Sequence, residues 1–544
     1  MYSTAMGIGK AFAEIGGKQD LLVAVDPGAA WRKLSAADYA LSIVVSVVCV
    51  LVLQVWQVRI GLDLSDEGLL WYNTQRTLAG ELALRDFQPY DPGRFYLFAG
   101  WARLCHNDGI VALRYGGAVV QFVALVPALL LLGRVLPSRW LLPPFGLIAA
   151  AWMVPRFKLV DVAASVFATW MLARLAAEPT HRRHLLAGMT VGLLWWIGRN
   201  HALYAGLATV MLVIVLAVDA RIGWPVLAAR VGWCGLGVVL GSLPMTTMLL
   251  AIPGYAAAYW ENAIARYARL HTTNMTRPVP WPWTKEGISV PGLGLGVLLV
   301  PVAIVIAVIL LSRVRRRRKS LREHSVFLAA TACAATWAHH LFSRAGLSTL
   351  GETGFPLVLL LAALPQAVAL ARRPLARALA WGALALVTVT TMPRMIPRMA
   401  AQRHRAQYVW ANIADERLYV TKTTLEICNL GGDVKRQMRP GETAAFVPYV
   451  PGLYAVLHLW CPLLDAYLAF PESTRRQEET IARMERYHTE WALIWPDRVD
   501  DRPDLGFVQT YPLVYQYIQA HFDLIRRVAA AGDVCVMHRR GGPP

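Results

Sequence analysis

Three carboxylates stand close together where the first long apolar run ends, in the segment Asp63-Leu-Ser-Asp66-Glu67-Gly68. A carboxylate at a membrane surface is costly to desolvate unless it is paired or used. One of these groups could act as a general base on a hydroxyl group. The alternative is structural, because Ser65 or Asp66 could cap a helix that begins near Gly68. The spacing alone leaves both interpretations open.

Basic and imidazole side chains interrupt the apolar runs further along the chain. Such groups could stabilise a phosphate that gathers negative charge during a reaction. An arginine between two half-length apolar runs is costly unless it faces a polar cavity, whereas one at a helix end can simply reach the interface. The candidates are Arg156, Lys158 and Asp161, then Arg199, Asn200 and His201, and finally His340 and Arg344.

Metal and cofactor sites have little support in the sequence. His339 and His340 are adjacent, and neighbouring residues of a helix point about 100° apart, so they are poorly placed to share one ion. The seven cysteines have no CxxC or Cys/His spacing, which gives no support for zinc or iron–sulfur sites. The sequence therefore names no certain cofactor and leaves room for a divalent cation.

The composition indicates a membrane protein. Of the 544 residues 56% are hydrophobic and only 16% are charged, whereas soluble domains have about 25% charged residues. A membrane-spanning helix needs about 20 apolar residues, although the run at 185–197 is too short to cross alone. We count eleven apolar runs: 39–60, 111–133, 140–154, 160–178, 185–197, 202–218, 226–252, 290–312, 325–342, 354–371 and 375–392.

The basic residues predict how these runs are oriented. The formal net charge is +19, but the densest block, at 313–322, lies between two apolar runs. It therefore favours a cytoplasmic loop over nucleic-acid binding, which we do not expect. On this topology residues 1–38 are cytoplasmic, and the loops 61–110 and 253–289 are periplasmic together with residues 394–544.

The chain changes character after residue 393, where charged residues become common. Short strand-like and helix-like patterns alternate there and predict a small periplasmic α/β domain over 394–544. Cys428, Cys461 and Cys535 lie in this region, where one disulfide could form. The predicted strands are 417–421, 444–449, 491–495 and 534–538, and the predicted helices are 475–488 and 513–528.

The first loop also carries a resemblance to a known family. The segment Asp66-Glu67-Gly68 is followed by a helix that ends at Gly80, by Arg85-Asp86 and by the turn Tyr90-Asp91-Pro92-Gly93. This order resembles the first extracytoplasmic loop of the GT-C glycosyltransferases, which include the protein O-mannosyltransferases and the lipid A aminoarabinose transferases. Members use polyprenyl-phosphate sugars, invert the anomeric centre and place an acidic residue in this loop. Many relatives have Tyr-Pro-Pro-Gly at the turn, so Asp91 leaves the subfamily open.

The resemblance implies a polytopic α-helical membrane domain of GT-C type over 39–393, with about eleven spans. It implies an inverting glycosyltransferase that moves a sugar from a polyprenyl-phosphate donor to a hydroxyl of a lipid, glycan or protein, at the periplasmic face of a bacterial inner membrane. The catalytic acid would be Asp66, with Glu67 beside it. Asp63, Asp86 and the candidates named above would bind substrate, and membrane lipids would surround the spans.

Two other functions fit the same composition. A transporter or flippase of a lipid-linked saccharide would share the basic cavity, but such proteins usually consist of two similar halves. No internal repeat is visible in this chain. The third interpretation is a scaffold protein with a sensory periplasmic domain. Neither alternative needs a carboxylate that takes up a proton, so substitution of Asp66 separates them from the enzyme.

Overall fold

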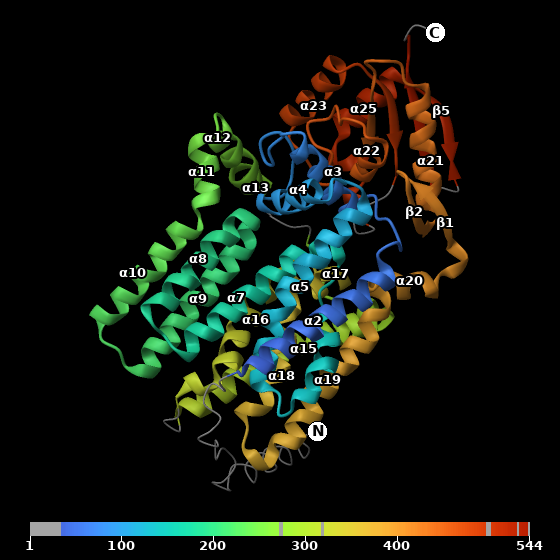
Figure 1. The fold of residues 1–544 in the computed structure, drawn as a ribbon. Helices are drawn as coiled ribbons and strands as arrows, with labels where there is room; N and C mark the ends of the chain where they lie inside the picture. Colours follow the sequence, from blue (N-terminus) through green and yellow to red (C-terminus); the bar gives the residue numbers. More distant parts are fainter. Residues whose placement is uncertain (1–33, 271–275, 317–319, 497–501, 530–531, 542–544) are drawn as a thin grey trace, which may run out of the picture.

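The computed structural model describes residues 34–270, 276–316, 320–496, 502–529 and 532–541. Figure 1 shows a helical bundle whose upper end carries short crossing helices and, above them, a mixed α/β region formed by the C-terminal part of the chain. The predicted fold class is therefore correct in outline.

Within these residues seven helices are long and apolar enough to cross a membrane. An eighth span results if α17 (Leu347–Thr353) and α18 (Phe355–Ala363), which are bent by 57° at their junction, count as one crossing. The chain is thus a multi-pass membrane protein. The seven helices are α2 (Ala36–Gln57), α5 (Ile110–Val135), α7 (Leu159–Ala177) with its preceding 3-10 turn, α9 (Arg199–Ala220), α10 (Trp224–Gly241), α15 (Pro291–Arg316) and α19 (Arg373–Met395).

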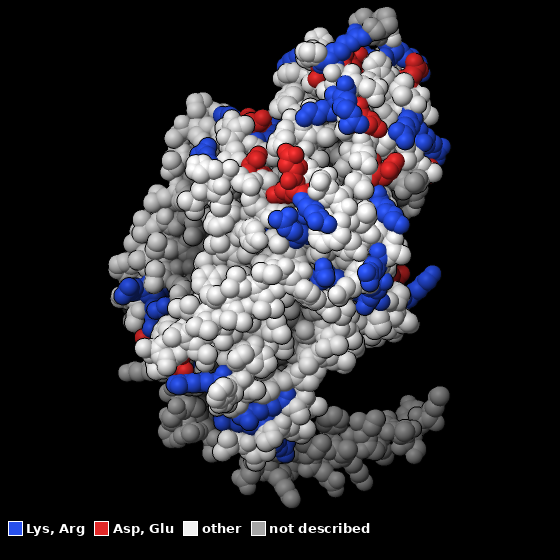
Figure 2. Space-filling model, turned by 45° about the vertical axis from the view of Figure 1, so that its right-hand side comes forward, with Lys and Arg blue, Asp and Glu red and all other residues white. Residues whose placement is uncertain are grey.

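The remaining apolar runs also form helices, namely α6 (Leu142–Ala151), α8 (His181–Ile197) and α16 (Ser325–Ser343). Each of these helices is too short or not apolar enough to cross a membrane by itself. The count of eleven crossings therefore stays a prediction. On the face shown in Figure 2, a broad surface with few charged residues separates basic groups at the lower end from the charged upper half, as expected of a membrane-embedded bundle.

Close helix packing fixes α8, which precedes the break at Gly198. A Cβ atom on Gly188 would lie 2.0 Å from the backbone oxygen of Cys234, and one on Gly241 would lie 2.1 Å from that of Met189. Glycine is therefore required where α8 crosses α10, since small residues let helix backbones approach closely in a membrane. This crossing fixes the position of α8, and so of the start of α9.

The first loop lies across the upper end of the bundle. It contains α3 (Asp66–Leu78) and α4 (Gly93–Cys105), which Figure 1 shows between the bundle and the C-terminal region. A second group of short helices follows α10. It consists of α11 (Leu243–Ala251), α12 (Tyr255–Tyr259), a π-helical turn (Trp260–Ala265) and α13 (Arg266–Leu270).

The C-terminal region begins with a hairpin of β1 (Tyr408–Ile413) and β2 (Glu416–Thr421). A four-stranded sheet follows, with the order β3-β4-β6-β5, in which the β3–β4 pair is parallel and the other two pairs are antiparallel. Its strands are β3 (Thr443–Val447), β4 (Thr489–Ile494), β5 (Phe522–Val528) and β6 (Val534–Arg539), and its helices include α21 (Lys422–Gln437), α22 (Pro451–Leu457), α23 (Thr474–Arg486) and α25 (Pro512–His521).

One predicted element of this region is wrong in its second half. The helix expected over 513–528 ends at His521, and residues Phe522–Val528 form strand β5 instead. The reason is tertiary, since β5 pairs with β6 at the edge of the sheet, and such pairing overrides local helical preference. Cys428, Cys461 and Cys535, which could have formed a disulfide, are free thiols.

The C-terminal region is not packed as a separate unit. Leu70 and Trp71 of α3 belong to the same buried cluster as Phe446 and Tyr454 of the C-terminal region. A Cβ atom on Gly68 would lie 2.5 Å from the Cα of Gly452, so two glycines are needed where the two backbones touch. The first loop and the C-terminal region therefore share one hydrophobic core.

Candidate active site

A cavity of about 270 Å³ lies where the bundle, the first loop and the C-terminal region meet. Most of the site residues predicted from the sequence line it, although they come from four separate parts of the chain. Those residues are Asp66, Lys158, Asp161, Arg199, Asn200, His201, His340 and Arg344.

Helix ends bring these side chains together. Asp66 is the first residue of α3, Asp161 lies in the first turn of α7, and Arg199 begins α9. His340 and Arg344 lie at the end of α16. The backbone amides of a helix start carry partial positive charge, so the convergence of helix starts favours bound anions.

The break between α8 and α9 positions Arg199. Gly198 is extended, with φ −175° and ψ 111°, and helix α9 starts directly after it. Asp91 accepts hydrogen bonds from the backbone amide and from Nη1 of Arg199, both at 2.9 Å. The polar break that the sequence predicted thus faces a cavity. Asp91 was not predicted as a site residue, although its place as an acid beside the first-loop turn was a usable signal.

Asp161 is the most heavily paired carboxylate of the cavity. Arg94 donates to both of its oxygens, at 2.7 and 3.1 Å, and Nε2 of His201 lies 2.7 Å from Oδ1. Burial on its own lowers the pKa of Arg94, but the charge of Asp161 raises it above its ordinary value, so this arginine stays charged. Lys158 lies 3.8 Å from Asp161 and 3.0 Å from the hydroxyl of Tyr90.

A second paired carboxylate, Glu352, comes from α17. Its side chain is buried and lies 3.3 Å from Nε2 of His340. Ligand atoms of Asp161, His201 and Glu352 lie within 4.8 Å of one another and could hold a metal ion. Glu352 was not predicted as a site residue, although its place directly before an apolar run was a usable signal.

Asp66 is held from the C-terminal side. The hydroxyl of Tyr449 donates to Oδ1 of Asp66 at 2.5 Å. The capping that the sequence suggested for Ser65 or Asp66 is not formed, because the Ser65 hydroxyl donates to the backbone oxygen of Tyr449. Asp63 caps the start of the helix instead, since its carboxylate accepts hydrogen bonds from the backbone amides of Ser65 at 2.9 Å and Glu67 at 3.4 Å.

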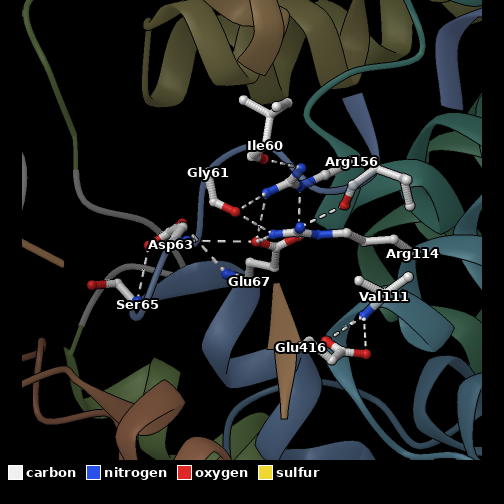
Figure 3. A network of polar contacts seen from close by, with 10 residues as sticks. Ile60, Gly61, Asp63, Ser65, Glu67, Val111, Arg114, Arg156 and Glu416 are labelled. Carbon is white, nitrogen blue, oxygen red and sulfur yellow. Dashed lines mark hydrogen bonds and ion pairs between the residues drawn. The ribbon is translucent and has the colours of Figure 1, made fainter. Parts of the chain in front are cut away.

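Glu67 and Arg156 lie outside the cavity lining, in the network of Figure 3. Arg114 donates to both oxygens of the Glu67 carboxylate, at 2.9 and 2.8 Å, and Arg156 pairs with it at 2.5 Å. Burial on its own raises the pKa of Glu67, but the two guanidinium groups lower it to about 2. Arg114 was missed, although a charge inside a predicted span called for a buried partner.

The same two arginines tie the first loop to the bundle. Arg114 donates to the backbone oxygens of Val58 and Gly61, each at 2.7 Å, and Arg156 donates to that of Ile60 at 2.7 Å. The network therefore fixes the chain directly before α3. It holds the loop that carries Asp66 without reaching the cavity.

Asp63 and Asp86, which the sequence proposed as substrate ligands, also lie outside the cavity lining. Asp86 accepts from the backbone amide of Leu82 at 2.8 Å and pairs with Arg85 at 2.9 Å. Burial on its own raises the pKa of Asp86, but the Arg85 and Leu82 contacts lower it below its ordinary value. Its contacts are those of a turn-forming residue.

Aromatic side chains complete the cavity wall. Tyr467 and Phe470 of the C-terminal region line it beside Tyr90 and Tyr267. The ring centroids of Tyr467 and Phe470 are 5.6 Å apart, and those of Tyr267 and Phe470 are 6.4 Å apart. No motif in the sequence linked the C-terminal pair to the first loop, because the contact depends on how the domains pack.

No protein-family model matches the chain, and no curated protein matches its sequence. Among solved structures, ArnT from Cupriavidus metallidurans bound to undecaprenyl phosphate is similar, with a TM-score of 0.51 and 12% identity over 94% of this chain and 100% of that chain. The oligosaccharyltransferase of Archaeoglobus fulgidus in its apo form has a TM-score of 0.41 and 11% identity, over 89% of this chain and 72% of that one. The archaeal oligosaccharyltransferase AglB from Archaeoglobus fulgidus, in complex with an inhibitory peptide and a dolichol-phosphate, has a TM-score of 0.40 and 10% identity, over 93% of this chain and 74% of that one.

The similarity to ArnT extends over nearly the whole of both chains. ArnT is a GT-C glycosyltransferase, so this chain has the GT-C fold. The resemblance seen in the first loop of the sequence is thereby confirmed at the level of the fold.

Proposed function

We propose that the chain is an inverting glycosyltransferase that moves a sugar from a polyprenyl-phosphate donor to an acceptor hydroxyl. The observation that carries the proposal is the cavity, because it places one carboxylate, Asp66, in the same space as the cations Lys158, Arg199 and Arg344. An inverting transfer needs both a base beside the acceptor and positive charge beside the leaving phosphate.

The reaction follows from these positions. Asp66 takes the proton of the acceptor hydroxyl, and the oxygen attacks the anomeric carbon as the bond from that carbon to the phosphate oxygen breaks. The electron pair of that bond leaves with the polyprenyl phosphate. Lys158, Arg199, His340 and Arg344 stabilise the charge that collects there, and a water-poor cavity strengthens these contacts. The ArnT structure contains undecaprenyl phosphate, which supports a lipid phosphate as donor group.

The positive-inside rule supports a periplasmic site in a bacterial inner membrane. Helix α15 ends in Arg313, Arg315 and Arg316, whereas its first residue, Pro291, follows the loop that reaches the cavity. The basic end of a span faces the cytoplasm, so the cavity would face the periplasm. Cys105, which is exposed at the end of α4, tests the orientation. A membrane-impermeant maleimide should label it in intact spheroplasts but should not label Cys105→Ala at that site; labelling only after permeabilisation contradicts the proposal.

The test of the function uses the lipid-linked sugar that accumulates in cells lacking the chain. Purified protein in nanodiscs should release undecaprenyl phosphate from this lipid when membranes of the same cells supply the acceptor hydroxyl. Asp66→Asn should lower turnover by about 10²–10⁴-fold, because an amide cannot accept the proton. Asp108→Asn is the matched control, since Asp108 lies in the same loop outside the cavity lining.

Three results would contradict the function. The first is that cells lacking the chain accumulate no lipid-linked sugar. The second is that the protein uses a nucleotide sugar and not a lipid-phosphate sugar. The third is that Asp66→Asn retains full activity, which is the result expected of a flippase or a scaffold.

A metal ion is not needed by this arrangement. Asp161, His201 and Glu352 could hold one, but Asp161 already accepts from Arg94 on both oxygens and Glu352 already pairs with His340. A divalent cation would have to displace or neutralise these partners, and it would enter a space that arginine and lysine already make positive. We therefore propose that the side-chain cations alone hold the phosphate.

A further inference from the structure

The contact between Tyr449 and Asp66 joins residues that are 383 positions apart in the chain. Tyr449 lies between β3 and α22 of the C-terminal region, and its hydroxyl donates to Oδ1 of Asp66. Among the described residues, no other hydrogen bond to the Asp66 carboxylate is found. The contact therefore occupies one oxygen and leaves Oδ2 for the acceptor hydroxyl.

The position of Tyr449 is fixed by packing and by hydrogen bonds of the neighbouring backbone. Its ring packs edge-on against Tyr467, with centroids 4.4 Å apart. Its backbone oxygen accepts from the Ser65 hydroxyl at 3.1 Å, and the amide of Gly452 donates to the backbone oxygen of Leu64 at 2.8 Å. The loop that carries Tyr449 and the segment that carries Asp66 are thus hydrogen-bonded to each other at two further points beside the hydroxyl–carboxylate contact.

In the hydrogen bond between Tyr449 and Asp66, Tyr449 is the donor. Burial, and then the negative charge of Asp66, raise the pKa of Tyr449 well above its ordinary value. The phenol therefore stays protonated and acts as a donor. A carboxylate that is free to rotate can present either oxygen in many directions, whereas a base is effective only within hydrogen-bond reach of its proton.

We propose that Tyr449 is a positioning residue that fixes the rotation of the Asp66 carboxylate, so that the C-terminal region supplies part of the catalytic apparatus. This inference rests on the proposed function, because it assumes that Asp66 takes up a proton. It gives the C-terminal region a role in turnover. Tyr449 acts through Asp66 and not on the substrate.

The test is Tyr449→Phe, which keeps the ring against Tyr467 and removes the hydroxyl. Turnover of the accumulated lipid-linked sugar should fall about 10–100-fold, because small misplacements of a reacting group carry effects of this size. The KM for that donor and the affinity for undecaprenyl phosphate should both stay within about twofold of the unmodified protein, because a residue that acts only on the base removes no binding contact.

Tyr72→Phe is the matched control. The Tyr72 hydroxyl accepts from the backbone amide of Cys461 at 2.8 Å, so the substitution removes a hydroxyl from the same interface, on the helix α3 that also carries Asp66. It should lower the unfolding temperature and leave turnover per folded molecule unchanged. A merely structural role for Tyr449 would give that same pattern, with lost stability and intact kcat, and would overturn the inference.

A double substitution shows whether Tyr449 acts through Asp66. In an Asp66→Asn background, Tyr449→Phe should cause no further loss, since residues that work as one unit are not additive. A further loss of the same size as in the unmodified background would mean that Tyr449 acts elsewhere and would overturn the inference. The two failures stay distinct: full activity of Asp66→Asn refutes the proposed function, whereas its collapse beside full activity of Tyr449→Phe refutes only the positioning role.

Discussion

Asp66 and Glu67 are adjacent in the chain, but their carboxylates lie in different surroundings. Asp66 lines the cavity and accepts one hydrogen bond from Tyr449. Glu67 is 2% exposed and is held by Arg114 and Arg156. Successive residues of a helix point about 100° apart, so the start of α3 presents one carboxylate to the cavity and the other to the bundle.

The difference separates an anchored charge from a usable one. A carboxylate that holds two guanidinium groups gives up those contacts when it takes a proton, and the low pKa of Glu67 expresses that cost. Asp66 has a neutral partner and an open side. We infer that Glu67 fixes the loop and that Asp66 is left for chemistry. The following experiments test this division, from the largest expected effect to the smallest.

Glu67→Gln should destabilise the protein most. The amide leaves two buried arginines without their anion, and breaking a buried ion pair in this way costs about 3–5 kcal/mol. Glu178→Gln is the control, because Glu178 pairs with Arg183 while 57% exposed, and surface pairs contribute about 0–1 kcal/mol. Unfolding in detergent measures both. If the two variants are equally stable and only Glu67→Gln loses turnover, then Glu67 and not Asp66 is the reactive carboxylate, and the division is wrong.

The stabilisation by Glu67 should disappear in acid. Its pKa is lowered from 4.5 to about 2 in the folded chain, so between these values the unfolded chain binds more protons. Stability from this group is therefore complete above about pH 4.5 and falls by about 3 kcal/mol as the pH falls toward 2. The difference in unfolding temperature between the unmodified protein and Glu67→Gln should shrink over this range. A difference that stays constant from pH 7 to pH 3 would contradict the assignment.

Arg344→Ala should weaken both donor binding and turnover. A buried phosphate that loses a charged hydrogen-bond partner loses about 1.5–3 kcal/mol, which corresponds to about 10–100-fold in affinity. Binding of undecaprenyl phosphate to the protein in nanodiscs measures the first effect. Arg103→Ala removes an exposed arginine of α4 and should bind as the unmodified protein does. Unchanged affinity in Arg344→Ala would remove this residue from the phosphate site.

A chelator should have the smallest effect. If arginine and lysine hold the phosphate, EDTA should change turnover by less than about twofold at neutral pH, because the partners of Asp161 and Glu352 are side chains. Loss of activity that zinc, manganese or magnesium restores would show instead that Asp161, His201 and Glu352 bind a catalytic ion.

Much of the fold could be predicted because it depends on local patterns. Each of the eleven predicted apolar runs contains a helix, since burial in lipid leaves few alternatives for such sequences. The polar break at Arg199 could be found in the same way, because a charge there is costly unless it faces a cavity. The loop motif around Asp66 was also sufficient to indicate the GT-C fold.

The division between Asp66 and Glu67 could not be predicted, because it depends on how α3 is rotated against its neighbours. Three aromatic residues were missed for a related reason: Tyr449 contacts Asp66, and Tyr467 and Phe470 line the cavity, only when the C-terminal region packs onto α3. The strand β5 belongs to the same class of error. In each case the structure depends on a contact between residues far apart in the sequence, and such a contact cannot be predicted from a local sequence pattern.

A cryo-EM structure of the protein with bound undecaprenyl phosphate tests the central claim most directly. The phosphate should lie in the cavity within hydrogen-bond distance of Arg344 and of at least one of Lys158, Arg199 and His340, with the Asp66 carboxylate still held by Tyr449 and facing the same space. A phosphate bound outside this cavity, or one that contacts Glu67, Arg114 and Arg156 instead, would contradict the account.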